Sequence, residues 1–297
     1  MAQARLSRSE QITGWVFIAP ALVLLGLFMI YPILWSLWMS FQVGKGMNFS
    51  FGGVQNIVRL TKDPVFIRAL VNTLTFLVIQ VPIMIVLALL AATALNDPTL
   101  RFRGLFRTAI FLPCVTSLIA YSTLFKSMFA TDGIVNKMLM ALWIIQEPIH
   151  WLQDPFWAKV LIILAITWRW TGYNMVFYLA ALQNIDRSIF EAARIDGASA
   201  WDRFWHITVP MLKPVILFTT IISTIGTLQL FDEVNNITQG GPSDSTLTLS
   251  LYIYNLTFKF MPSFGYSATV SWVIVLLVAV LSFAQFIIAR DKKGAAS

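Results

Sequence analysis

Four side chains that can exchange protons fall within one short polar segment: Glu191, Asp196, Asp202 and His206. Acidic groups beside a histidine at a membrane surface are residue types that acid–base catalysis uses. A membrane enzyme is therefore one interpretation of the segment. The surrounding residues favour another, because they place these side chains in a capped pair of short helices that explains them without catalysis.

The segment is predicted to form two short helices joined by a turn. Ser188 and Glu191 have the spacing of a capping box, which predicts a helix start at Ser188. Gly197 follows at the point where a left-handed residue would end that helix. Ser199 is placed to open the second helix, and Pro210 is expected to stop it.

Three aromatic residues give the second helix a distinct face. Trp201, Phe204 and Trp205 recur at helical spacing and are predicted to lie on one side. One interpretation is an interfacial helix on lipid headgroups, with its tryptophans in the aromatic belt. The other is a docking element for a cytoplasmic partner, and the residues alone leave both open.

The rest of the chain contains no residue pattern typical of a metal site or of a nucleotide-binding site. His150 and His206 lack metal-ligand spacing, and the single cysteine, Cys114, excludes an intrachain disulfide. The stretch Gly44-Lys45-Gly46 lacks the upstream glycine and the hydroxyl residue of a phosphate-binding loop. We therefore expect no metal, no cofactor and no ATP site on this chain, so that any energy source is a partner.

The elements that carry the polar segment are predicted to be membrane-spanning helices. The chain is 58% hydrophobic and 12% charged, against about 25% charged in a typical soluble domain. A bilayer core needs about 20 apolar residues per helix. Blocks with no charge, or with Arg169 as the single exception, cover residues 15–39, 69–95, 108–125, 160–182, 214–231 and 267–289. The predicted fold class is an all-α integral membrane protein with six transmembrane helices, the first a retained anchor rather than a cleaved signal.

The basic residues predict the orientation of these helices. Twelve Lys and Arg residues lie on the side that carries both termini, and eight are spread over the longer loops of the other side. Both termini are therefore expected in the cytoplasm, with residues 1–14 as an N-terminal segment, 15–290 as the transmembrane domain and 291–297 as a tail. The net charge of +7 is then a topology signal, and nothing in the sequence suggests nucleic-acid binding.

A solute path is suggested by polar groups inside two of the predicted spans. In the fourth, Arg169 is accompanied by Trp170, Tyr173 and Asn174, residue types that suit a sugar because rings stack on its C–H face while amides bond its hydroxyls. A snorkelling arginine within an aromatic belt is the alternative. In the fifth, a hydroxyl stripe follows one helix face and lines either a cavity or a helix–helix contact: Thr220, Ser223, Thr224 and Thr227.

Several motifs resemble a known family. Glu191-Ala192-Ala193, Asp196-Gly197-Ala198, Ile207, Pro210 and Pro214 resemble the EAA loop of ABC importer permeases, although Val209 stands where that family prefers leucine. Further motifs resemble those of the sugar-permease branch of the family, and the resemblance extends from about residue 12 to residue 290. They are Ala19-Pro20-Ala21, Tyr31-Pro32, Asn72-Thr73-Leu74, Phe111-Leu112-Pro113, Asp132-Gly133-Ile134-Val135-Asn136 and Thr238-Gln239-Gly240-Gly241-Pro242.

The resemblance implies an ABC type I importer permease fold in a bacterial plasma (inner) membrane, with residues 188–214 as the EAA coupling loop. This loop would dock on a dimer of ATP-binding subunits, which hold the ATP and Mg. A second homologous permease subunit and an extracytoplasmic solute-binding protein would complete the importer. The cargo would be a di- or oligosaccharide such as lactose or another galactoside. The coupling residues implied are Glu191, Ala192, Ala193, Asp196, Gly197, Trp201, Phe204 and Pro210.

The alternative function is a secondary transporter of a small polar solute, driven by an ion gradient. Such a protein would be expected to bury acidic residues for its coupling ion. The six apolar blocks contain no Asp or Glu, which disfavours this alternative. Asp232 and Glu233 follow the fifth block, in an outer loop expected either to lie near the solute-binding protein or to be simply solvated.

Overall fold

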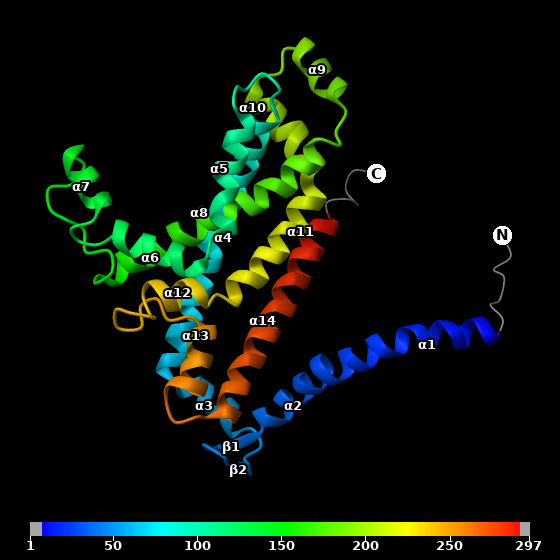
Figure 1. Ribbon diagram of the computed structural model, residues 1–297, viewed down its shortest axis with the longest axis vertical. Helices are drawn as coiled ribbons and strands as arrows, with labels where there is room; N and C mark the ends of the chain where they lie inside the picture. Colours follow the sequence, from blue (N-terminus) through cyan, green and yellow to red (C-terminus); the bar gives the residue numbers. More distant parts are fainter. Residues whose placement is uncertain (1–7, 292–297) are drawn as a thin grey trace. The chain divides into compact units, whose positions relative to one another are not determined.

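The computed structural model describes residues 8–291, and nearly all of its regular structure is helical (Figure 1). Two compact units divide the chain. One comprises the described residues up to Lys62 together with Ile253–Trp272, and the other comprises Asp63–Tyr252 with the chain from Val273 onward. Residues 1–7 and 292–297 lie outside the described residues. They include half of the predicted N-terminal segment, residues 1–14, and nearly all of the predicted tail, residues 291–297.

Long apolar helices dominate both units, as the composition predicts. Five helical runs of the described chain are long and apolar enough to cross a membrane, and a bent pair of shorter helices makes a sixth if it counts as one span. The five are Ile12–Ser40, Pro64–Asn96, Pro155–Leu182, Ala200–Leu228 and Phe264–Ala289.

The third predicted span, residues 108–125, is not the continuous helix that the sequence predicted. Helix α5 (Arg103–Val115) and helix α6 (Leu118–Met128) are bent by 101° at the break between them. Thr116 leaves the helical region, with φ −70° and ψ 150°, and its hydroxyl donates to the Pro113 carbonyl at 2.8 Å. Apolar composition does not show such a bend, because both helices are apolar. Pro113, inside α5, was the local signal for it, since an interior proline kinks or breaks a helix.

The unit that contains the chain start combines a long helical run with a small hairpin. The run consists of α1 (Arg8–Leu25), a π-helical turn (Gly26–Ile30) and α2 (Tyr31–Ser40), and the hairpin pairs β1 (Gln42–Lys45) with β2 (Asn48–Phe51). The buried Asn56 of α3 (Gln55–Lys62) donates to the carbonyls of Ser40 and Gln42, at 2.9 and 2.8 Å. Thr269 of α14 (Phe264–Asp291) also donates to the Ser40 carbonyl. These bonds satisfy the backbone where helix becomes hairpin.

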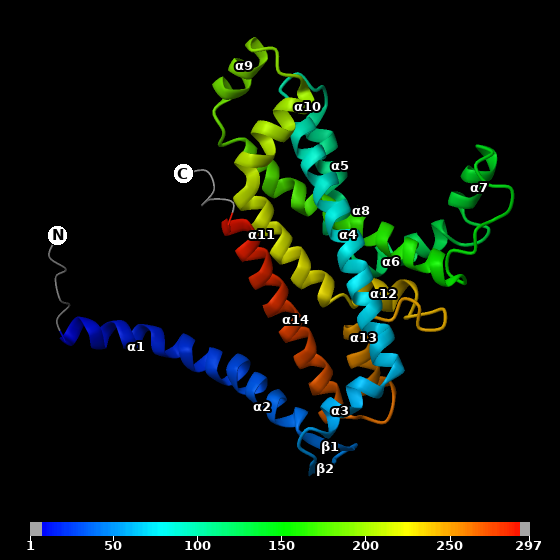
Figure 2. The same cartoon turned by 180° about the vertical axis from the view of Figure 1, so that it is seen from behind.

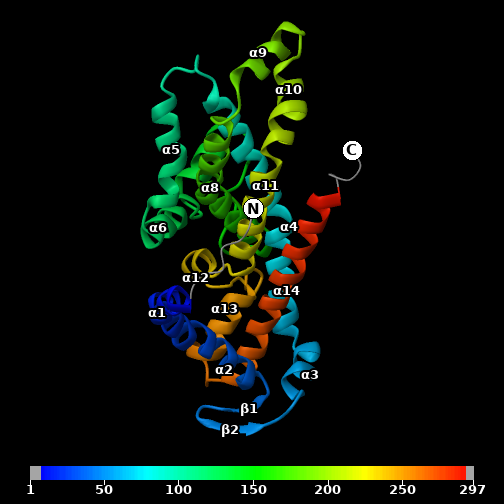
Figure 3. The ribbon, with the colours of Figure 1, turned by 90° about the vertical axis from the view of Figure 1, so that its right-hand side faces the viewer.

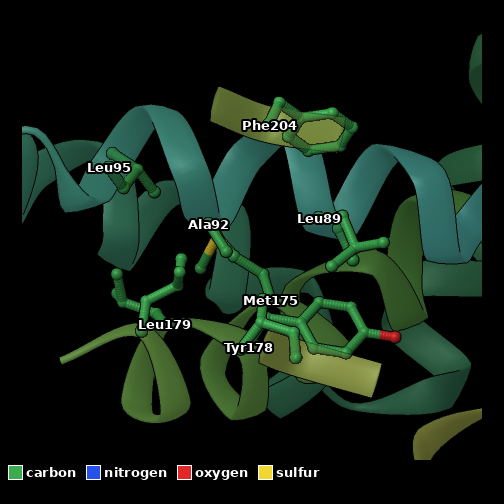
Figure 4. Close-up of a cluster of buried hydrophobic side chains, with 10 residues drawn as sticks. Leu89, Ala92, Leu95, Met175, Tyr178, Leu179 and Phe204 are labelled. Carbon is green, nitrogen blue, oxygen red and sulfur yellow. The ribbon is translucent and has the colours of Figure 1, made fainter. Parts of the chain in front are cut away.

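The second unit is built around two long helices that pack along each other, α4 (Pro64–Asn96) and α8 (Pro155–Leu182). Helices α5 and α11 (Val209–Leu228) lie against them (Figure 2). A buried cluster joins α4 and α8 to the start of α11 (Figure 4): Ala88, Leu89, Ala92, Leu95, Met175, Tyr178, Leu179, Leu182, Phe204 and Leu212. The Tyr178 hydroxyl within it is bonded to Thr219 Oγ1 at 2.6 Å, so the core leaves this polar atom satisfied.

Shorter helices lie before and after α11 in this unit (Figure 3). Helices α9 (Arg187–Ile195) and α10 (Ala200–Arg203) precede it, and α12 (Asp232–Ile237) follows it. The remaining short helices are α7 (Ile134–Ala141) and α13 (Leu249–Tyr254).

The motif around Asp132-Gly133 has a structural role in the loop that carries α7. Asn136 is fully buried, and its amide nitrogen donates to the carbonyls of Thr131 and Ile149 at 3.0 and 2.9 Å. Its amide oxygen accepts from Ile149 N and from Trp151 Nε1. The asparagine thereby fixes this loop with one fully bonded side chain.

Helices α5 and α8 approach each other closely at Gly172, which gives a testable prediction. A Cβ atom there would lie 2.1 Å from the Ile110 carbonyl oxygen and 2.9 Å from Phe111 Cα. We expect Gly172→Ala to force the helices apart and to cost about 1–3 kcal/mol of stability, seen as a lower thermal unfolding midpoint in detergent. The control is Gly226→Ala in α11, where a Cβ would meet nothing within 4 Å. Equal midpoints for the two variants would contradict the prediction.

Candidate functional site

The first helix of the EAA loop begins earlier than the sequence predicted. Its N-cap is Asp186, whose carboxylate accepts from Ser188 N at 2.9 Å, and α9 starts at Arg187. The predicted capping box between Ser188 and Glu191 is therefore wrong, because Ser188 already lies in the first turn of α9 and Asp186, an equally good N-cap residue, takes the capping position. Hydrogen bonds from Ser188 hold the pKa of Asp186 below its usual range.

The turn after α9 confirms the predicted conformation of Gly197. Its φ is +80°, in the left-handed region. Gly197 N donates to Arg194 O at 3.1 Å, and Ala198 N donates to Ala193 O at 2.9 Å. These two bonds close the helix C-terminus in the way that a left-handed glycine allows. Ala192 O also accepts a hydrogen bond, from Asp196 N at 3.0 Å. The backbone carbonyls of both alanines, Ala192 and Ala193, are thus bonded to residues of the turn.

The second helix opens at Ser199, as predicted, through a complete capping box. Asp202 N donates to Ser199 Oγ at 3.1 Å, and Ser199 N donates back to Asp202 Oδ2 at 3.1 Å. The prediction that Pro210 stops this helix is wrong. A π-helical turn (Phe204–Thr208) leads directly into α11, with Pro210 in the first turn of that helix. Proline is tolerated in a first turn because its backbone nitrogen needs no partner there.

The predicted aromatic face forms, but its members have different surroundings. The ring centroids of Trp201, Phe204 and Trp205 lie 5.2–5.6 Å apart. Phe204 is 6% exposed within the buried cluster (Figure 4), whereas Trp201 is 61% and Trp205 48% exposed. Phe204 therefore anchors the segment to the helical core, and the two tryptophans lie at its surface.

Most predicted coupling residues are accessible on the surface of the described chain. Within α9 no residue is buried, and Ile195 is 88% exposed. Glu191, Ala192, Asp196, Gly197, Trp201 and Pro210 are exposed, Ala193 is half-buried, and Phe204 is buried. These residues therefore form an accessible surface rather than an enclosed site.

The polar residues of the segment bond locally rather than converging on a reaction centre. Asp202 is engaged by Ser199, and His206 Nδ1 lies 3.0 Å from the Asp202 carbonyl oxygen. Among the residues that the structure describes, no group of three His, Cys, Asp or Glu side chains is arranged to hold a metal ion.

A cleft of about 790 Å³ separates α9 and α10 from the loop between α4 and α5. Asp97 of that loop and Arg194 of α9 both line it. Hydrogen bonds from Thr99, and to a smaller extent the positive charge of Arg194, lower the pKa of Asp97. The loop at residue 97 and the EAA loop therefore face each other across this cleft, a relation that sequence motifs did not indicate.

A second cavity of about 360 Å³ lies among α4, α8, α11 and α12. Five of the eight residues predicted for the solute path line it: Trp170, Tyr173, Asn174, Ser223 and Thr227. The other three, Arg169, Thr220 and Thr224, are not among its lining residues. Gln80, Gln229, Asp232 and Glu233 also line it, and sequence reasoning did not include them in the path.

The predicted hydroxyl stripe on α11 divides between two roles. Thr220 Oγ1 donates to Ile216 O at 2.6 Å, and Thr224 Oγ1 accepts from Gln285 Nε2 at 2.8 Å. These two serve backbone bonding and helix contact, the alternative left open by the sequence. Thr227 donates to Gln80 Oε1 at 3.2 Å at the cavity wall.

Arg169 does not line the cavity, and its largely buried side chain lies beside a buried acid rather than extending along an exposed surface. Its Nε lies 4.0 Å from Glu233 Oε1, and the two side chains are 11% and 6% exposed. Trp170 Nε1 donates to the same carboxylate oxygen at 3.4 Å. The interpretation of Glu233 as part of a solvated loop is therefore wrong. The acid lies outside the apolar blocks in sequence, but α12 folds back against α6 and α8.

Two sequence motifs cooperate to hold the loop after α12. Asn72 Nδ2 donates to the carbonyls of Asp244 and Leu247, at 2.9 and 3.0 Å. The next residue, Thr73, accepts from Leu249 N at 3.0 Å. The Asn72-Thr73 motif of α4 thus fixes the loop that contains Gly240-Gly241-Pro242. The bonded residues are more than 170 positions apart in sequence, so the spacing of residues within either motif could not reveal the contact.

Comparison with known proteins agrees with this arrangement. The family model "Binding-protein-dependent transport system inner membrane component" matches residues 61–293. The chain is 67% identical over 294 residues to the lactose transport system permease protein LacF of Rhizobium radiobacter, covering 98% of this chain and 99% of that protein. It is 34% identical over 290 residues to the arabinooligosaccharides transport system permease protein AraP of Halalkalibacterium halodurans, covering 96% and 90%.

A solved structure shares the fold. The crystal structure of a bacterial ABC transporter involved in the import of the acidic polysaccharide alginate contains a chain that superposes with a TM-score of 0.82 and 22% identity, covering 95% of this chain and 96% of that one. The predicted all-α fold of an ABC importer permease is thereby confirmed. So is the expectation of a transport subunit rather than an enzyme, since the chain belongs to the family of inner membrane components of binding-protein-dependent transport systems.

Proposed function

We propose that this chain is a permease subunit of an ATP-driven importer that carries a di- or oligosaccharide into the cytoplasm, with lactose or another galactoside as the first candidate. The observation that carries the proposal is the cavity beside α8. It combines the rings of Trp170 and Tyr173 with the polar groups of Asn174, Ser223 and Thr227. Rings stack on the apolar face of a sugar, while amides and hydroxyls bond its rim. The 67% identity to a lactose permease supports a galactoside as the cargo.

The EAA loop, residues 188–214, is proposed as the contact with a separate dimer of ATP-binding subunits that holds ATP and Mg. Helix α9 has nine residues, and none of them is buried by the described chain. A helix this short is marginal by itself, and Ile195 exposes an apolar side chain at its end. A covering partner would account for both features, with Glu191 exposed to meet a basic group.

A second permease and an extracytoplasmic solute-binding protein are the other partners that we propose. In the apolar window of the span Ile12–Ser40, no residue is buried by the described chain, so lipid or another subunit must cover it. A related alginate transporter was solved with a pentasaccharide-bound periplasmic protein. The proposed location is the bacterial inner membrane, with both termini cytoplasmic and residues 15–290 as one transmembrane domain.

Uptake by the reconstituted importer tests the function. Vesicles containing this chain, its partner permease and the ATPase, supplied with the binding protein and radiolabelled lactose, are expected to accumulate label only when ATP is present. Maltose, trehalose and an arabinooligosaccharide serve as competitors that define the cargo. Uptake that needs a proton or sodium gradient but no ATPase would support the alternative, a secondary transporter.

A further inference from the structure

The cavity exposes acidic but no basic side chains to a solute. Asp232 and Glu233 are its charged residues, and no Lys, Arg or His of the described chain lines it. Its remaining wall is apolar or uncharged, with Gln80 and Asn174 among the polar groups. A charge acts more strongly within low-dielectric walls than in bulk water. On this chain's side, both charged residues that line the cavity are therefore acidic.

The Glu233 carboxylate is held in place by groups around one of its two oxygens. Trp170 Nε1 donates to Oε1, and Arg169 Nε lies 4.0 Å from the same atom. The Arg169 guanidinium carbon lies 5.1 Å from the ring centroid of Tyr121, and Tyr121 is buried and does not line the cavity. Of the two members of the ion pair, only Glu233 is among the residues that line the cavity, although both side chains are largely buried, Arg169 at 11% and Glu233 at 6% exposed.

We propose that Glu233 is a specificity-determining residue that contacts the solute and restricts this path to uncharged saccharides. The inference rests on the proposed function and names the substrate class of the same site. Sugar hydroxyls donate hydrogen bonds, and a carboxylate accepts stronger ones than a neutral group does. A saccharide that itself carries a carboxylate meets repulsion from Glu233 and, at the cavity rim, from Asp232. Arg169 and Trp170 act as positioning residues for the carboxylate.

Direct binding to the purified transporter tests the proposal without the binding protein, so that delivery does not contribute. The probes are lactose and lactobionate, its analogue with a carboxylate at the oxidised end. The intact complex is expected to bind lactose at least about tenfold more tightly, a factor that corresponds to about 1.4 kcal/mol. Glu233→Gln should weaken lactose binding, strengthen lactobionate binding and reduce the ratio several-fold.

The matched control is Glu147→Gln, which makes the same chemical change at an exposed residue outside the cavity and should leave the ratio unchanged. Glu233→Asp keeps the charge and should keep the preference. Equal binding of both probes, or an unchanged ratio in Glu233→Gln, overturns the inference. If the complex binds no saccharide at all, the proposed function fails, and this inference fails with it.

Discussion

Gly197→Pro is expected to abolish ATP-driven uptake while leaving membrane insertion intact. Proline holds φ near −65°, whereas Gly197 has φ +80° and donates its N–H to Arg194 O. Both the turn and this bond would be lost, and α9 would leave its place beside α10. The core should tolerate the change because a Cβ at Gly197 meets nothing within 4 Å. The measurements are uptake by reconstituted vesicles and retention of the ATPase during purification.

Gly197→Asn is the matched control for this experiment. Asparagine enters the left-handed region more readily than other residues with a side chain, and the site has room for it. This variant should retain most of the uptake and the bound ATPase. Normal transport by Gly197→Pro would show that the geometry of the turn is not needed for coupling, and the proposed role of the EAA loop would then be wrong.

Arg169→Met is expected to give the largest loss of stability. The substitution removes the cation beside Glu233 and leaves a carboxylate that is 6% exposed without its partner. Removing one member of a buried ion pair typically costs about 3–5 kcal/mol. The thermal unfolding midpoint of the detergent-purified protein should fall accordingly, and α12 should become more accessible to protease because Glu233 is one of its contacts with α8.

The double variant Arg169→Met/Glu233→Gln separates electrostatics from packing. With both charges removed, no buried charge is left unpaired, and most of the lost stability should return. If Arg169→Met unfolds at the same temperature as the unmodified protein, the pair does not stabilise the native state. If the double variant is no more stable than Arg169→Met, the loss comes from packing around the guanidinium rather than from the unpaired acid.

Local sequence patterns predicted the features of the EAA loop that depend on backbone chemistry. Gly197 takes the left-handed conformation, and Ser199 caps the second helix. The helix start was misplaced because two side chains, Asp186 and Ser188, can each cap free N–H groups, and their competition depends on the exact chain path. Pro210 was misread for a related reason, since the same residue type stops a helix or sits comfortably in its first turn.

The solute cavity could be predicted only in part. Trp170, Tyr173 and Asn174 follow each other along one helix, so a helical period was enough to group them. Glu233 lies 63 positions beyond Trp170, and the bond between the two exists only because α12 folds back after α11. The bend between α5 and α6 escaped detection in a similar way, because apolar composition is the same on both sides of it.

Composition predicted a helical membrane protein, and the resemblance of the EAA-loop motifs to those of ABC importer permeases predicted its place in a transporter. Runs of apolar residues require burial in lipid or protein wherever they are placed, and turn and capping residues act over a few positions of the chain. The tertiary structure alone decided which distant groups meet: Arg169 with Glu233, Asn72 with the loop at Asp244, and the glycine at 172 with α5. Such contacts depend on how helices pack and bend, and the periodicity of a single helix carries no information about its neighbours.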